Sequence, residues 1–122
     1  MSFEPTLQKM VDACPGVLGL ALMGSDGIPV AEIEAAPAEN GSEVVGGAGV
    51  EFGRILDEIR KASDAIGGGR LEEAVVALAN FTLIFRGVDD ELFLVLALAP
   101  NGNLGKARFL LRRHLLELRE QL

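Results

Sequence analysis

The sequence is poor in the side chains that most often carry out chemistry. Its 122 residues include one cysteine, Cys14, and one histidine, His114, which excludes an internal disulfide and a cysteine-rich or histidine-rich metal site. Tryptophan and tyrosine are absent, so the chain lacks the usual aromatic platforms on which nucleic-acid bases stack. The formal net charge of −7 and the pI near 4.6 also argue against nucleic-acid binding.

Long hydrophobic runs are missing as well. The longest wholly apolar run, residues 92–100, falls far short of the roughly 20 residues that cross a bilayer, so we expect no membrane insertion. The N-terminus has no basic segment followed by an apolar one, so we expect no signal peptide. The length suits one domain over residues 1–122. These features together favour a small cytoplasmic globular domain.

Catalytic motifs are also lacking. Lys106 follows Gly102 and Gly105 at the wrong spacing for a phosphate-binding loop, which would also need a hydroxyl residue after the lysine. Cys14 falls on an apolar helical stripe, and His114 lies beside the leucines of the last helix. Neither residue belongs to a Ser–His–acid or Cys–His arrangement. We therefore expect no catalytic, cofactor-binding or metal-binding residue, no cofactor, and no enzyme activity.

The first third of the chain predicts a helix followed by two strands. Apolar residues at spacings of three and four after Pro5 predict a short amphipathic helix that ends at Pro15. The apolar runs at residues 17–23 and 28–34 flank Asp26-Gly27, a pair typical of hairpin turns because glycine accepts a positive φ. Pro29 cannot donate a hydrogen bond to a sheet, so the second strand is expected at an edge.

Residues 43–66 predict a long amphipathic helix. Its apolar side chains fall within an arc of about 120°: Val44, Val45, Ala48, Phe52, Ile55, Leu56, Ile59, Ala62 and Ile66. Gly46, Gly49 and Gly53 form a stripe beside that arc, which Arg60 continues. Each glycine inside a helix costs about 0.8–1 kcal/mol relative to alanine, which a close approach of another helix would offset. Alternatively, the helix begins near Val50 and the first glycines belong to a loop.

The second half of the chain predicts three strands and a final helix. The strands are expected at residues 71–79, 81–88 and 92–99, the last being apolar on both faces and therefore central, with helices above and below it. The final helix, residues 103–122, carries five basic and two acidic side chains, in contrast to the acidic remainder. Its Phe109 and Leu116 lie away from the leucine face, where they either pack against the first helix or form an exposed docking point. The order of elements predicts an antiparallel sheet in a layered α+β domain.

Three segments in this order resemble the Roadblock/LC7 family over essentially the full chain. They are residues 19–28 (GLALMGSDGI), the long helix that ends at Gly67, and residues 92–106 with their N-G-N-x-G-K sequence. The resemblance implies a profilin-like αββαβββα fold, with a five-stranded antiparallel sheet and helices on both faces. Within the family, the sequence is more similar to the bacterial MglC-like members than to the MglB-like ones.

The resemblance implies a homodimer in which the long helices and the third strands of two copies meet. Eight residues are then expected at the dimer interface: Gly46, Gly49, Gly53, Leu56, Arg60, Leu71, Val75 and Ala77. The exposed face of the long helix is the candidate surface for other partners: Glu51, Arg54, Glu58 and Lys61.

The resemblance also implies function by association. The expected role is a non-catalytic adaptor in the polarity or motility system of a small Ras-like GTPase of the MglA type. Its partners would be an MglB-like Roadblock protein and a RomR-like polarity regulator, which would recruit it to a cell pole. The alternative is an MglB-like activator of GTP hydrolysis that acts on the GTPase directly. A ligand-sensing domain is a third class, but few polar groups converge in the sequence to hold a small molecule.

Overall fold

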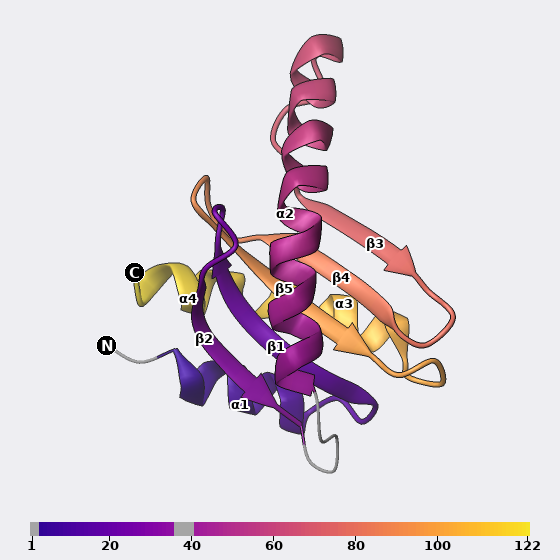
Figure 1. Ribbon diagram of the computed structural model, residues 1–122. Coiled ribbons are helices and arrows are strands. Elements are labelled where there is room, and N and C mark those ends of the chain that lie inside the picture. Colours follow the sequence, from indigo (N-terminus) through magenta and orange to yellow (C-terminus); the bar gives the residue numbers. More distant parts are fainter. Residues whose placement is uncertain (1–2, 36–40) are drawn as a thin grey trace.

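The computed structural model describes residues 3–35 and 41–122 as alternating helices and antiparallel strands (Figure 1). In chain order the elements are α1 (Glu4–Asp12), β1 (Val17–Gly24), β2 (Pro29–Glu34), α2 (Gly41–Ile66), β3 (Glu73–Ala77), β4 (Thr82–Gly87), β5 (Leu92–Leu98), α3 (Leu104–Arg113) and α4 (Leu115–Glu120). The expected α+β fold is confirmed, and α2 includes the early glycines, so the alternative of a helix starting near Val50 is wrong.

The strands form one five-stranded sheet in the order β2-β1-β5-β4-β3, with every neighbouring pair antiparallel. Pro29 begins the edge strand β2, as its missing N–H requires. The central strand is β5, whose side chains are buried on both faces, as its continuous apolar sequence predicts.

The two faces of the sheet carry separate apolar cores. The terminal helices α1, α3 and α4 cover one face, where Leu20, Ile84 and Leu94 are buried against Leu7 and Leu111. The long helix α2 crosses the other face (Figure 1). There Met23, Phe85 and Val95 are buried against Val45 and Leu56 of α2.

The turns that set the strand register follow the local sequence. Gly27 adopts a φ of +85°, and the Asp26 carboxylate accepts a hydrogen bond from the Ile28 N–H at 3.0 Å, which closes the turn between β1 and β2. At the end of α2, Gly67 takes a φ of +72°, and the Gly68 N–H donates to the Ser63 carbonyl at 2.9 Å. The helix therefore stops where its glycine-rich end predicts.

The final helix differs from expectation in two respects. It is divided at His114, whose backbone leaves helical geometry at φ −95° and ψ 4°, and the turn that follows buries Leu115 and Leu118. Phe109 and Leu116 are 52% and 65% exposed, so the interpretation that they pack against α1 is wrong.

Candidate association surface on α2 and β3

The free edge of β3 is one part of the candidate surface. Among the strands that the structure describes, β3 pairs with β4 alone, so its other edge carries backbone N–H and C=O groups without a strand partner. Val75 and Leu78 on this hairpin are 39% and 44% exposed, and Ala77 is exposed too. Such an edge is a template for pairing with another strand.

The second half of α2 is the other part. The helix packs on the sheet through Val45, Ala48 and Leu56, and beyond Leu56 it extends past the sheet (Figure 1). Ile55, next to Leu56, is 50% exposed, and Ile59 and Ile66 further along are 39% and 83% exposed. The apolar arc predicted for the whole helix is thus only partly covered by the chain's own sheet.

An apolar groove lies between the first half of α2 and the β3–β4 hairpin. Its volume is about 240 Å³, and Val44, Phe52, Leu78, Phe81 and Leu83 supply its apolar lining. Glu43 and Glu51 also line it, which gives the groove two acidic groups. The sequence alone does not predict this groove, because Leu78 and Phe81 are apolar residues flanking a turn and only the fold brings them next to α2.

The three glycines of the stripe have different surroundings. A Cβ at Gly53 would meet nothing within 4 Å, and one at Gly46 would meet only the Glu32 carboxylate at 4.0 Å. Gly49 is instead buried against β1, where a Cβ would lie 2.7 Å from Met23 Cε and 3.1 Å from its Sδ. Gly49 therefore serves packing within the chain, and its place at the dimer interface stays a prediction.

Two further residues expected at the interface also have roles within the chain. Leu56 is 2% exposed and belongs to the α2 core, so its side chain is already covered within the chain, and its place at the dimer interface stays a prediction. Arg60 pairs with Asp57 one turn earlier at 3.2 Å. Leu71 is half-buried beside the same core, whereas Val75 and Ala77 remain exposed on β3.

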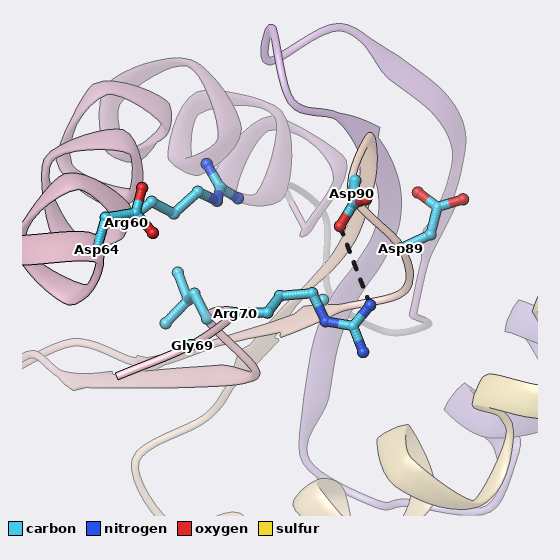
Figure 2. Close-up of a pocket in the computed structure, with 8 residues that line it drawn as sticks. Arg60, Asp64, Gly69, Arg70, Asp89 and Asp90 are labelled. Atoms are coloured by element: carbon cyan, nitrogen blue, oxygen red, sulfur yellow. Dashed lines mark ion pairs between the residues drawn. The ribbon is translucent and has the colours of Figure 1, made fainter. Parts of the chain in front are cut away.

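Arg60 also lines a charged hollow of about 370 Å³ where the end of α2 faces the β4–β5 turn (Figure 2). Arg70 and Asp90 come within 4.0 Å of each other there, and Asp64 and Asp89 add further carboxylates. Asp89 is already occupied, because it accepts hydrogen bonds from two backbone N–H groups of its own turn at 2.8 Å. The hollow thus holds opposite charges that largely compensate each other.

Three of the four residues expected to bind other partners lie together. Arg54, Glu58 and Lys61 line a shallow hollow of about 400 Å³ on the exposed side of α2, and Lys61 pairs with Glu58 at 3.4 Å. Glu51 is also exposed but lies at the apolar groove. All four are accessible, which a contact surface requires.

Two titratable groups outside these surfaces, Cys14 and Glu117, have shifted pKa values. Burial raises the pKa of the Cys14 thiol, which disfavours the reactive thiolate. His114 and Lys9 hydrogen-bond the Glu117 carboxylate, each at 2.9 Å, and these bonds lower the pKa of Glu117 to about 2.

In the described ranges, no three His, Cys, Asp or Glu side chains are placed to hold a metal ion. No helix in the same ranges is both long enough and apolar enough to cross a bilayer.

Several solved structures have a fold similar to that of this chain. No family model matches the sequence, and no curated protein matches it. The crystal structure of MglC from Myxococcus xanthus aligns over all of both chains at 33% identity, with a TM-score of 0.69. A Roadblock/LC7 domain from Streptomyces avermitilis aligns over 99% of this chain and 98% of its own, at 14% identity and a TM-score of 0.83. The gliding protein MglB from Thermus thermophilus aligns over 92% of this chain and 82% of its own, at 18% identity and a TM-score of 0.81.

The 33% identity to MglC holds over the full length of both chains, and the sheet order and the two helical layers agree with the fold of the Roadblock/LC7 domain. On these grounds the chain belongs to the Roadblock/LC7 family.

Proposed function

We propose that this chain is a non-catalytic, homodimeric adaptor in the polarity or motility system of an MglA-type Ras-like GTPase. It binds an MglB-like Roadblock protein and a RomR-like polarity regulator, and these partners recruit it to a cell pole. The observation that carries the proposal is the uncovered α2–β3 surface on a chain that is 33% identical to MglC over its full length.

Two incomplete features at one end of the sheet support the proposed homodimer. Pairing β3 with the β3 of a second copy satisfies the free backbone groups and continues the sheet across two chains. The same two-fold arrangement carries the second half of each α2 over the partner chain, where Ile55 and Ile59 become covered. The apolar groove beside Phe52 and Phe81 is the surface that receives them.

Two observations support the adaptor over the activator. The identity to MglC is 33%, whereas that to the MglB structures from Thermus thermophilus and Myxococcus xanthus is 18% and 15%. The α2 helix of this chain is rich in glycine and in acidic residues, a composition that the family resemblance implies is unlike that of MglB-like members. The proposed adaptor therefore acts on the GTPase through its Roadblock partner.

A mixing experiment with size-exclusion chromatography and light scattering tests this role. The chain is run alone, with an MglA-like GTPase bound to a GTP analogue, and with an MglB-like Roadblock protein. We expect a dimer that co-elutes with the Roadblock protein and leaves the GTPase peak unchanged. Direct binding to the GTPase, together with faster GTP hydrolysis when this chain alone is added, would replace the adaptor by the activator.

A further inference from the structure

A second exposed surface lies on the opposite side of the sheet from α2. Phe109 of α3 and Leu116 of α4 are 52% and 65% exposed, and Arg112 and Arg113 between them are exposed as well. We call these four residues the α3–α4 patch. Because α3 and α4 pack on the sheet face that α2 does not cover, a dimer formed through α2 and β3 leaves the patch open on both chains.

The arginines of the patch differ from the other cations nearby. Arg108 is held by Glu73 at 2.7 Å, Arg119 donates to the Val88 carbonyl at 2.7 Å, and Lys9 pairs with Glu117. Arg112 and Arg113 have no such partner within residues 3–35 and 41–122. Two uncompensated positive charges therefore flank two exposed apolar side chains.

Arg113 also borders a hollow between α1 and the end of α3. The hollow has a volume of about 540 Å³ and is lined by Leu110, Arg113 and His114, together with the Lys9–Glu117 ion pair, whose two charges compensate each other. On the helix, Arg113 lies between Phe109 and Leu110, so the patch and the hollow are continuous. The patch thus combines the exposed apolar side chains of Phe109 and Leu116 with the positive charges of Arg112 and Arg113.

We propose that the α3–α4 patch docks an acidic amphipathic helix of a partner protein. Phe109 and Leu116 lie on the two helical segments on either side of the break at His114, so they offer two separate apolar contacts to a facing helix with apolar side chains along one face. The unpaired Arg112 and Arg113 select carboxylates on the flanks of that helix.

The charge distribution favours a protein helix over an anionic lipid surface. Residues 103–122 carry five basic and two acidic side chains, whereas the rest of the chain carries six basic and sixteen acidic ones. The acidic body repels an extended anionic membrane, but a single acidic helix contacts the patch alone. The same body repels acidic segments elsewhere on the surface, which confines such a helix to α3 and α4.

The test uses a fluorescein-labelled peptide with leucines at i, i+3, i+4 and i+7 and glutamates on both flanks. Fluorescence anisotropy with the full chain is expected to show saturable binding that weakens as salt is raised. Two variants are expected to weaken binding about tenfold or more: the single variant Phe109→Ser, and the double variant Arg112→Glu with Arg113→Glu. These side chains are exposed, and circular dichroism verifies that each variant keeps its fold.

Arg70→Glu is the control for each of the single reversals Arg112→Glu and Arg113→Glu, because it makes the same charge change at an exposed residue beside the end of α2. Binding unchanged in this variant supports the proposal, and an equal loss would move the binding site to the end of α2 and overturn it. Absence of binding, or equal binding of a peptide with lysines in place of glutamates, also overturns it. Binding to phosphatidylserine vesicles that Arg112→Glu with Arg113→Glu abolishes would assign the patch to membranes instead.

Discussion

Gly49 of α2 lies directly against Met23 of β1, and a Cβ on Gly49 would stand 2.7 Å from the end of that side chain. Met23 is fully buried, so the contact sets how closely α2 approaches the sheet. The glycine that sequence periodicity places in an intermolecular stripe therefore holds the helix onto its own chain.

This contact predicts opposite outcomes for leucine at two glycines of the same helix. Gly49→Leu overpacks the core around Met23 and is expected to lower the free energy of unfolding by about 1–3 kcal/mol or more. Gly53→Leu enters open space within the chain and gains helix propensity of about 0.8 kcal/mol, so it does not weaken the fold of the single chain. Urea denaturation followed by circular dichroism, at a protein concentration low enough for the chain to be monomeric, compares the two. Equal destabilisation by both variants would contradict the assignment of Gly49 to the intrachain core.

If the exposed apolar side chains of α2 lie in the dimer interface, one negative charge introduced among them should weaken the dimer. Ile59→Glu places a carboxylate where the proposed dimer buries an apolar side chain, and it is expected to weaken dimerisation at least about tenfold. Leu116→Glu makes the same kind of change at an exposed residue on the other layer and is the control. Light scattering over a dilution series measures both. A dimer that persists unchanged in Ile59→Glu would remove α2 from the interface.

The Glu117 network predicts a dependence of stability on acid. Hydrogen bonds from His114 and Lys9 lower the pKa of Glu117 from 4.5 to about 2 in the folded chain. Because the folded pKa is the lower one, the stabilisation is present above about pH 4.5 and is lost as the pH falls toward 2. Glu117→Gln is therefore expected to lower the melting temperature slightly, because Glu117 lies at the surface, and to do so more at pH 6 than at pH 3. A difference that stays the same at both values would show that the carboxylate charge plays no part.

The sequence predicts the arrangement of this domain better than it predicts its surface. Pro29 marks the edge strand and the continuous apolar run of β5 marks the central one, because each feature follows from backbone chemistry at a single position or strand. Ile55 and Leu56 occupy the same apolar arc, yet one is half exposed and the other is buried. Periodicity cannot separate them, because they point about 100° apart around the helix and only the folded structure shows which of the two directions faces the sheet. The sequence does not predict the break at His114 either, because leucines recur at helical spacing on both sides of it.

Disulfide cross-linking across β3 tests the central claim, a homodimer built on that strand, most directly. Val75 is the middle residue of β3, and antiparallel pairing about a two-fold axis brings the centres of the two strands together. The natural Cys14 is buried, so Ala74→Cys, Val75→Cys and Val76→Cys each add one thiol within the candidate interface. Under mild oxidation we expect at least one of them to form a covalent dimer, whereas Leu116→Cys, exposed on the other layer, does not. If none of the three β3 variants cross-links while the protein remains a dimer in solution, the two copies meet elsewhere and the account is wrong.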